Sequence, residues 1–455
     1  MLYHLFSYLD KHYDMVGAGL FQYITFRAAL GVLISLLISL LFGNKVINWL
    51  QGFAIEAERN LGLPNADNKR KVPSMGGVLI HTSILVPTLL LGDLTNVYVW
   101  LMILATVMMG AVGFLDDYLK LKSKAIKQRR AIAYEKAKAE ALAQNLPIPE
   151  KPNTEKEDSD GLAGWYKVLG QVLLGTVVGL VLFFNNKVVV RVDRDFAFSG
   201  KCQIIETVKV EKIPQSKVYE EMYHVKTSIT NVPFFKGNEF DYSSLLFFLG
   251  ENARDWVWII FIPLIILIVT AVSNSANLTD GVDGLAAGVS AIIGAVLCVL
   301  AYISGNHIFA DYLNVLYIPY SGELVIFAAC FWGACVGFLW FNAHPAQVFM
   351  GDTGSLALGS CIAVMAIIIR KELLLPLLCG IFFVEALSVI IQRLVFKYRL
   401  KKYGRPYAEA NRVFLMTPLH HHYQKKGIHD SKLVTRFWLI GIFLAVLTVV
   451  TLKIR

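Results

Sequence analysis

Long apolar segments recur along the whole chain and constrain its fold more than any other feature. A helix needs about 20 apolar residues to cross a bilayer. Ten segments approach that length: 22–43, 76–96, 97–115, 164–184, 256–273, 285–304, 323–341, 356–369, 373–395 and 434–452. Within hydrocarbon every backbone N–H and C=O needs a partner in the chain, which a helix provides. The sequence therefore predicts an all-α polytopic membrane protein with about ten transmembrane helices, forming a single domain over residues 1–455.

The composition agrees with this class and excludes others. The 455 residues are 56% hydrophobic, with a mean hydropathy of +0.54. In a membrane protein, the net charge of +9 indicates cytoplasmic loops and contact with membrane lipids, so no nucleic acid is expected as a partner. Five of the six cysteines lie in apolar runs, which argues against a disulfide framework. The N-terminus lacks a basic segment and a small-residue cleavage site, so we expect no cleaved signal peptide.

The distribution of Lys and Arg predicts the orientation of the spans. With the N-terminus outside, segments 45–75, 116–163 and 396–433 face the cytoplasm and hold 5, 10 and 9 Lys and Arg residues. Segment 185–254 also holds 10, but long loops cross the membrane regardless of their charge. In this orientation all the acidic motifs described below lie on the cytoplasmic side.

Two segments between spans are interpreted as insertions. Residues 124–158 begin as a charged helix and continue through Pro-Ile-Pro into an acidic linker. We interpret them as a solvated cytoplasmic insertion rather than a partner-docking element. Residues 185–254 contain the stretches KVVVRV and QIIETVKVEKI, which predict a small extracytoplasmic β-element.

Carboxylates adjoin three of the apolar runs and are the first candidates for function. Asp116 and Asp117 close one run in FLDDYLK, Asp280 and Asp283 follow another in NLTDGVDG, and Asp352 follows a third in FMGDTGS. Acids beside membrane segments are functional candidates because carboxylates are costly in hydrocarbon. At the C-terminus of a helix, the first pair would oppose the helix dipole, which disfavours a purely structural role. Carboxylate oxygens near phosphates suit Mg²⁺, so we predict a metal- and phosphate-handling site at the membrane surface.

The two glycine-flanked motifs carry further candidate ligands. NLTDGVDG lacks the spacing of an EF-hand loop, and a simple polar turn between spans is its alternative interpretation. Phe349 in FMGDTGS offers an aromatic ring that could stack on a base. Asn342, just upstream, could offer its side-chain amide to a ligand.

Basic and histidine-rich motifs complete the set. KRKVPSMGG places three cations before a span, where phosphate binding and positive-inside anchoring are equally good interpretations. In TPLHHHYQ, three adjacent histidines cannot share one helix face, because neighbours are about 100° apart. Phosphate contact or proton transfer therefore fits better than a metal site made of histidine alone. A polar loop with chance histidines is the alternative.

Taken together, KRKVPSMGG, GFLDDYLK, NLTDGVDGLA, FNAHPAQVFMGDTGSLALG and TPLHHHYQKKG resemble the polyprenyl-phosphate N-acetylhexosamine-1-phosphate transferase superfamily. They occur in the superfamily's order, and the Pro-Ser-Met-Gly-Gly and His-His-His versions favour its muramoyl branch. The resemblance implies a ten-span protein of the bacterial inner membrane with a cytoplasmic active site. It also implies UDP-N-acetylmuramoyl-pentapeptide and undecaprenyl phosphate as substrates, lipid I and UMP as products, and a requirement for Mg²⁺. Whether the chain is a monomer or a homodimer stays open.

By motif position, the resemblance implies catalytic roles for Asp116, Asp117, Asp352 and His420, with Asp352 as the metal ligand. The nucleotide site would be lined by Asn277, Asp280, Asp283, Asn342 and Phe349, with Lys69 and Ser74 assisting. Phosphate or lipid headgroup would contact Lys120 and Lys167, and the site would be completed by His421 and His422. The insertion at 124–158 falls between Lys120 and Lys167, but neither insertion removes a motif residue.

The chemistry implied is transfer of a phospho-sugar from UDP to a lipid phosphate, either by direct attack or through an aspartyl-phosphate. Two alternative functions differ in their sugar donor or in their class. A sibling transferase would use UDP-N-acetylglucosamine instead. A secondary transporter would place ionisable groups near the bilayer midplane, often in repeated halves, whereas these acids lie at span ends and no halves repeat.

Overall fold

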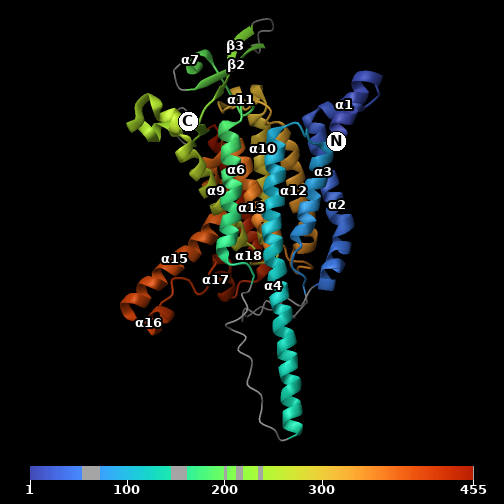
Figure 1. Cartoon of the computed structure of the whole chain (residues 1–455), viewed down its shortest axis with the longest axis vertical. Coiled ribbons are helices and arrows are strands. Elements are labelled where there is room, and N and C mark those ends of the chain that lie inside the picture. Colours follow the sequence, from blue (N-terminus) through green and yellow to red (C-terminus); the bar gives the residue numbers. More distant parts are fainter. Residues whose placement is uncertain (54–71, 145–160, 199–201, 212–218, 234–238, 454–455) are drawn as a thin grey trace.

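The computed structural model describes residues 1–455 except 54–71, 145–160, 199–201, 212–218, 234–238 and 454–455. It is a bundle of long helices with small β-sheets at one end and a single projecting helix at the other (Figure 1). Each of the ten predicted spans coincides with a helix of this bundle. These are α2 (Ile24–Phe53), α3 (Gly77–Leu91), α4 (Val97–Ala143), α6 (Gly164–Phe184), α9 (Trp258–Thr279), α10 (Leu285–Ser304), α12 (Glu323–Asn342), α13 (Gly351–Ile368), α15 (Gly380–Tyr403) and α18 (Asp430–Thr451).

Two of these segments differ from simple spans. Among the described residues, eight helices are long and apolar enough to cross a membrane. The helices η3–α14 (Glu372–Leu374 and Leu375–Leu378) and α15 form an apolar pair bent by 76°, which is either a broken span or a re-entrant loop. Helix α3 is a shorter apolar helix of 15 residues that contains Pro87. The prediction of a polytopic, all-α membrane architecture is confirmed.

Helix α13 forms the centre of the bundle, and 89% of its 18 residues are buried. Glycines let neighbouring helices approach its N-terminal end closely. A Cβ added at Gly77 of α3 would overlap the backbone of Gly354, and one at Gly113 of α4 would overlap the carbonyl of Asp352. These contacts bring the first turn of α13 against α4 at the level of Asp116 and Asp117.

Two predicted boundaries near the acids are wrong. Helix α4 does not end at Asp117 but continues to Ala143, because the Lys-, Ala- and Glu-rich sequence that follows has high helix propensity. The acid pair is therefore in the middle of a helix, and the argument from an opposing C-terminal dipole does not apply. Helix α13 begins at Gly351, five residues before the predicted span, so Asp352 lies in its first turn rather than in a preceding loop.

The segment 185–254 contains the predicted β-structure. Strands β1 (Val190–Val192), β3 (Tyr219–Lys226) and β2 (Gln203–Glu211) pair antiparallel in that order, with Val192 opposite Tyr223. Strands β4 (Ile229–Asn231) and β5 (Glu239–Asp241) form a second sheet. Thr230 and Asn231 of β4 both donate a hydrogen bond to the carbonyl of Arg370, each at 3.1 Å. The sheets are thereby tied to the end of the bundle opposite to the projecting part of α4 (Figure 1).

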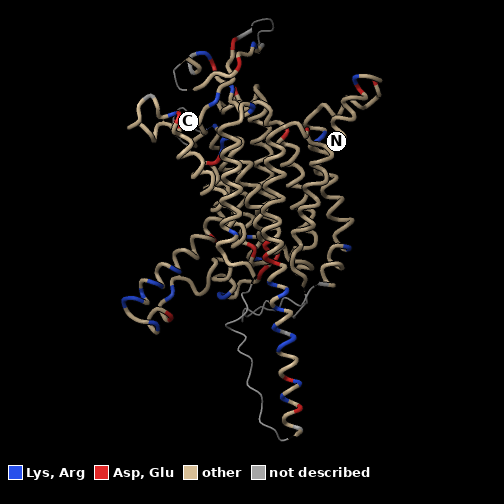
Figure 2. Tube along the Cα trace, in the orientation of Figure 1, with Lys and Arg blue, Asp and Glu red and all other residues tan. Residues whose placement is uncertain are grey.

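Short helices complete the described chain: α1 (Leu2–Tyr13), η1 (Ala18–Gln22), α7 (Arg194–Ala197), η2 (Tyr242–Asn252), α8 (Ala253–Trp256), α11 (His307–Leu313), α16 (Arg405–Ala410) and α17 (Leu419–Lys425). Acidic residues gather where α4 leaves the bundle, and basic residues, with a few acidic ones, follow the projecting part of α4 and the far end of α15 (Figure 2). This charge distribution agrees with the loops that the sequence places in the cytoplasm.

Candidate active site

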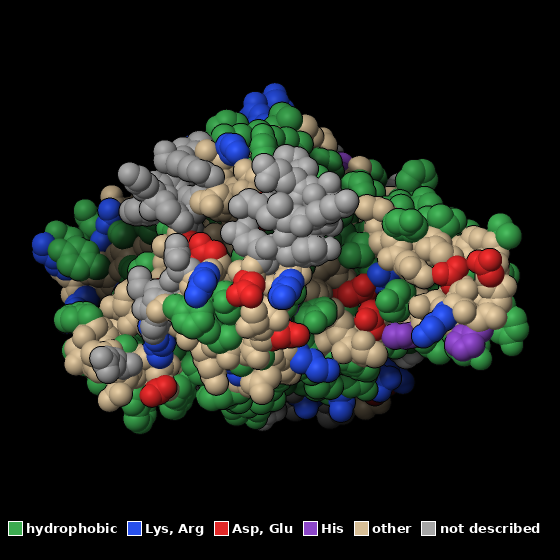
Figure 3. All heavy atoms as spheres, turned by 90° about the horizontal axis from the view of Figure 1, so that it is seen from above, with side chains coloured by type: hydrophobic (Ala, Val, Ile, Leu, Met, Phe, Trp, Pro, Cys, Tyr) green, Lys and Arg blue, Asp and Glu red, His purple; other side chains and the backbone are tan. Residues whose placement is uncertain are grey.

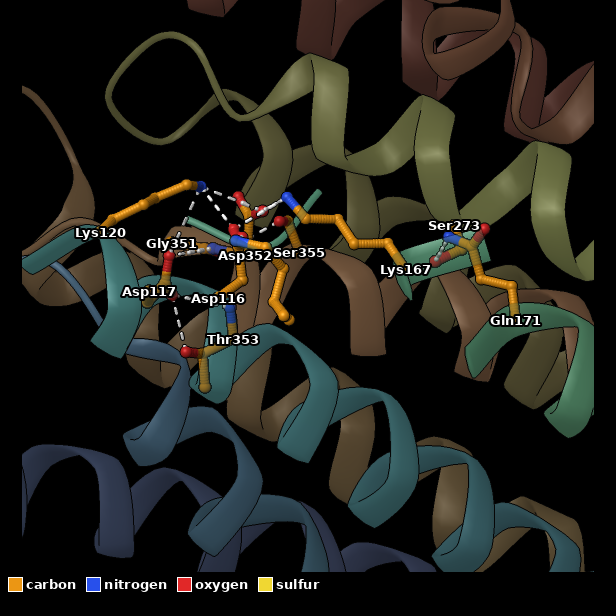
Figure 4. Close-up of polar contacts among 11 residues, drawn as sticks. Asp116, Asp117, Lys120, Lys167, Gln171, Ser273, Gly351, Asp352, Thr353 and Ser355 are labelled. Carbon is orange, nitrogen blue, oxygen red and sulfur yellow. Dashed lines mark hydrogen bonds and ion pairs between the residues drawn. The ribbon is translucent and has the colours of Figure 1, made fainter. Parts of the chain in front are cut away.

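Three carboxylates from two helices meet at one end of the bundle. Helix α4 supplies Asp116 and Asp117, and helix α13 supplies Asp352 (Figure 4). One oxygen from each of the three lies within 4.8 Å of the others. The first two side chains are buried and the third is partly exposed. Such a group of hard oxygen ligands is suited to a divalent cation such as Mg²⁺.

Two lysines reach into the same cluster from different helices. Lys120 Nζ of α4 lies 2.6 Å from Asp116 Oδ2 and 3.2 Å from Asp352 Oδ2. Lys167 Nζ of α6 lies 2.8 Å from Asp116 Oδ2 and also contacts Asp352 Oδ2. Three carboxylates therefore face two ammonium groups, an arrangement that can exchange internal ion pairs for a bound cation and a bound phosphate.

Asp117 has a second role that its sequence position did not reveal. Its Oδ2 accepts hydrogen bonds from the backbone N–H of Thr353 at 2.9 Å and from Thr353 Oγ1 at 2.7 Å. Its Oδ1 accepts a longer one, 3.2 Å, from the N–H of Asp352. A carboxylate at this position satisfies free N–H groups of the helix end and complements the positive end of its dipole. Asp117 thus caps α13 from the neighbouring helix and fixes Asp352 in place.

The Pro-Ser-Met-Gly-Gly motif supports the start of α13 through backbone hydrogen bonds. Phe349 N–H donates to the carbonyl of Pro73 at 2.9 Å, and Gly76 N–H donates to the carbonyl of Phe349 at 2.8 Å. Ser74 is thereby placed beside Gly351, where a Cβ added to the glycine would lie 3.0 Å from the Ser74 hydroxyl. Lys69, predicted to assist there, lies outside the described residues.

A second group of predicted residues organises the turn after α9 and the segment before α13. Asn342 Oδ1 accepts the N–H of Gly284 at 3.0 Å, while its Nδ2 donates to the carbonyl of Val348 at 2.8 Å. Asp283 Oδ2 accepts the N–H of Ala346 at 3.2 Å. Asn342 therefore links two loops, a structural task that the sequence analysis did not assign to it. Its contact with a nucleotide stays a prediction.

The remaining nucleotide candidates flank the same turn. Asn277 lies in the last turn of α9, and its Nδ2 is buried without a hydrogen-bond partner among the described residues. Asp280 directly follows α9. Phe349 is partly buried and precedes α13 by two residues. The segment from Asn342 to Asp352 thus connects this turn with the carboxylate cluster.

The three histidines lie on the short helix α17 and point to different surroundings. His420 is fully buried, with Nδ1 3.2 Å from Glu385 Oε2 of α15. Its Nε2 packs so closely on Gly281 that an added Cβ there would overlap it, and it has no hydrogen-bond partner in the described chain. His420 therefore presents its free nitrogen to the turn that carries Asp280 and Asp283.

The neighbouring histidines are engaged elsewhere. His421 Nδ1 lies 2.7 Å from Gln424 Oε1, and His422 Nδ1 accepts the N–H of Leu415 at 3.1 Å. Partial burial, together with the nearby charge of Lys426, lowers the pKa of His422. The three rings therefore lie in three different surroundings.

Glu385 is a candidate that the sequence analysis missed. It is fully buried in α15, and its carboxylate also lies 3.3 Å from the backbone N–H of His420. The available signal was a single acid within the apolar run 373–395, since an ionisable residue within a membrane segment is a functional candidate by default.

No hydrogen bond or ion pair joins His420 to Asp116, Asp117 or Asp352 in the described chain, so the histidine and carboxylate groups are separate parts of the site.

The helical bundle and its carboxylate site define a membrane-embedded transferase, and residues 224–370 match the family model for Glycosyl transferase family 4. More specific relatives cover the full length. The chain is 48% identical to a phospho-N-acetylmuramoyl-pentapeptide-transferase of Flavobacterium psychrophilum and 47% identical to one of Flavobacterium johnsoniae, in both cases over 100% of either chain. It is 46% identical to one of Parabacteroides distasonis, also over 100% of both chains. The chain belongs to the phospho-N-acetylmuramoyl-pentapeptide-transferase family.

Proposed function

We propose that this chain transfers phospho-N-acetylmuramoyl-pentapeptide from UDP to undecaprenyl phosphate, which yields lipid I and UMP. The observation that carries the proposal is the cluster of three carboxylates and two lysines at one end of the bundle, in a chain of this family. Relatives named for the muramoyl substrate favour this activity over transfer from UDP-N-acetylglucosamine. They also disfavour a secondary transporter.

The metal proposed for this site is Mg²⁺, with Asp352 as its principal ligand. The residues fit it, because the donors are carboxylate oxygens and, within the described part of the chain, Asp116 Oδ2 contacts no donor other than the two lysines. Asp116 is close enough to share the ion. When bound, Mg²⁺ would neutralise pyrophosphate charge and stabilise the departing UMP.

The lysines are proposed to hold the phosphates. Lys120 and Lys167 are the more exposed partners of their ion pairs with Asp116, so their ammonium groups can turn toward an incoming phosphate. An oxygen of undecaprenyl phosphate attacks the phosphorus that bears the sugar, and the bond from that phosphorus to UMP breaks. A phosphate monoester loses its second proton at about pH 6, so a strong base is not required.

Direct attack is favoured over an aspartyl-phosphate intermediate on Asp117. Both oxygens of this carboxylate accept hydrogen bonds from the first turn of α13. An attack by Asp117 would break these bonds and release the helix end that positions Asp352. Asp117 would instead act on the lipid phosphate indirectly, through its negative charge and by holding the first turn of α13 in place.

The other predicted residues are assigned to the nucleotide and to the completion of the site. We propose that Asn277, Asp280, Asp283 and Phe349 line the nucleotide, with Ser74 and Lys69 assisting. His420, oriented by Glu385, would present Nε2 to this region. The site would face the cytoplasm of a bacterial inner membrane, which the Lys and Arg content of the loops at this end supports.

The test is a transferase assay with purified protein, Mg²⁺ and undecaprenyl phosphate, with UDP-N-acetylmuramoyl-pentapeptide or UDP-N-acetylglucosamine as donor. UMP release should require the muramoyl donor and should stop when the metal is chelated. Asp352→Asn should lower turnover by at least about 100-fold, since loss of a metal ligand removes several kcal/mol of transition-state stabilisation.

The matched control is Asp93→Asn, which removes an acid beyond the far end of α4 and should leave turnover near the wild-type value. Calorimetric titration of Mg²⁺ separates a lost metal ligand from a misfolded protein. UMP release with the acetylglucosamine donor alone would overturn the assignment of substrate, and normal turnover of Asp352→Asn would overturn the assignment of the metal.

A further inference from the structure

The segment η2, Tyr242–Asn252, joins the β-sheets to the span that begins with α8 and α9, and it exposes a cluster of large apolar side chains. Phe247 is 83% exposed and Phe248 68% exposed. Leu245 and Leu249 beside them are also exposed. We call these four side chains the η2 patch. No charged residue occurs between Tyr242 and Gly250. Contiguous exposed apolar surface of this kind marks a site of contact with a partner or a membrane.

The η2 patch is held in place from its other face. Tyr242 and Leu246 are buried in the main hydrophobic core, and Tyr242 OH donates a hydrogen bond to Glu372 Oε1 at 2.9 Å. Asp241 caps the segment, since its Oδ1 accepts the N–H of Ser243 at 2.9 Å and the hydroxyl of Ser228 at 2.6 Å. These contacts hold the buried face of η2 against the bundle, and the η2 patch on the opposite face is thereby held at the surface.

After the stretch 251–255, which contains Glu251, Arg254 and Asp255, the chain again exposes large apolar side chains. Trp256, Trp258 and Ile259, at the start of the α8–α9 span, are exposed. Tryptophan is enriched where a span meets the headgroup region of a bilayer. In Figure 1 the yellow-green segment beside the C label projects sideways from the bundle, next to the upper end of α9. Seen from above, hydrophobic side chains follow much of the outline of the molecule at this end (Figure 3).

We propose that η2 is a membrane-surface anchor whose patch inserts among the lipids at the end of the bundle opposite to the carboxylate cluster. The occupant is the bilayer and not a second protein, because the patch lies shortly before the exposed Trp and Ile side chains with which the span begins. Phenylalanine and leucine side chains in the uncharged stretch 242–250 are suited to the boundary between headgroups and acyl chains. Through Asp241 and Tyr242, this contact fixes the position of the β-sheets relative to the membrane.

The test attaches an environment-sensitive fluorophore to a cysteine in the full-length protein, reconstituted in lipid vesicles. The variants are Phe248→Cys and, independently, Phe247→Cys, both in a Cys202→Ser background. The matched control is Lys209→Cys on the exposed strand β2. Quenching by doxyl-labelled lipids is compared with quenching by aqueous iodide, and size-exclusion chromatography verifies that each variant is folded.

At positions 247 and 248 we expect blue-shifted emission, strong quenching by the doxyl lipids and weak quenching by iodide. Position 209 should show the reverse. Iodide quenching at 247 and 248 as strong as at 209 would overturn the proposal, because the patch would then face water. Protection from both quenchers would also overturn it and would identify a protein, such as a second copy of this chain, as the occupant.

Discussion

At the scale of single residues, the site depends on close approach as much as on charge. Gly351 has a φ of +71°, and a Cβ added there would overlap Asp117 Oδ2. The start of α13 can therefore reach the capping carboxylate only because residue 351 has no side chain. The positive φ at this position is also a conformation that glycine adopts readily and alanine does not.

We predict that Gly351→Ala lowers turnover at least about tenfold, because a displacement that costs 1.4 kcal/mol in the transition state has that effect. Gly404→Ala is the matched control. Its φ is +81°, but the nearest atom to an added Cβ is Pro406 Cδ at 4.0 Å. Both variants place an alanine at a positive φ, which costs on the order of 1–3 kcal/mol, and only the first should lose activity. Equal turnover in the two variants would show that the contact with Asp117 has no functional role.

A second residue-scale prediction concerns Lys371, between α13 and η3 at the opposite end of the molecule. Its Nζ donates to Asn231 Oδ1, and burial lowers its pKa to about 7 from 10.5, although neighbouring Glu372 acts in the opposite direction. Because the folded-state pKa is the lower one, the unfolded chain binds more protons between pH 7 and pH 10.5. Stability should therefore rise with pH in this window.

Lys371→Met removes the buried ammonium group, so we expect a higher melting temperature at pH 7 and a weaker rise from pH 7 to pH 9. Lys187→Met, which removes an exposed ammonium group, is the control and should leave the melting temperature unchanged. Differential scanning fluorimetry in detergent measures both. A melting temperature of the unmodified protein that falls from pH 7 to pH 9 would contradict the prediction.

At the scale of elements, α4 combines two parts with different tasks. Its bundle part carries the acids, whereas the part that continues to Ala143 projects away from the bundle (Figure 1). The chain then returns at Gly161 and Leu162, and Leu162 N–H donates to Asp116 Oδ1 at 2.7 Å. The insertion thus lies between two parts of the site, and Leu162, which follows it in the chain, contacts one of the acids.

We predict that replacing about residues 130–155 with a short Gly/Ser bridge preserves most of the transferase activity, since a loop of changed length costs little closure entropy. A longer deletion that also removes Gly161 and Leu162 should abolish activity, because Asp116 loses its backbone donor. UMP release by both proteins, after a check of monodispersity, is the measurement. Inactivity of a well-folded shorter deletion would show that the projecting helix shapes the site.

At the scale of the whole molecule, the β-sheets and the projecting part of α4 lie at opposite ends of the bundle. The loop charges place the α4 end in the cytoplasm. We predict that Lys209→Cys reacts with a membrane-impermeant maleimide from outside intact cells and that Glu140→Cys does not, both in a Cys202→Ser background. Lysed cells should label at both positions and serve as the control. The reverse pattern in intact cells would overturn the orientation and the cytoplasmic site together.

The class of fold and the places of the apolar helices follow from the sequence alone, and so does the choice of most candidate residues. Each apolar run is a local signal, because about 20 apolar residues form a helix in lipid whatever their neighbours are. The sequence motifs likewise identified Asp116, Asp117 and Asp352 as candidates, although a sequence does not give the distances between these carboxylates. The helix at the start of the 124–158 insertion was also predicted from the sequence, since Lys, Ala and Glu favour a helix locally.

The use that the fold makes of these residues depends on contacts between distant segments. That Asp117 caps α13, that Asn342 links two loops and that Glu385 contacts His420 are facts about segments far apart in sequence. The length of α4 past its acids was missed because a change from apolar to charged residues marks the membrane surface and not the end of a helix. Contacts between helices depend on which faces meet, and that is set by packing around α13 rather than by any local pattern.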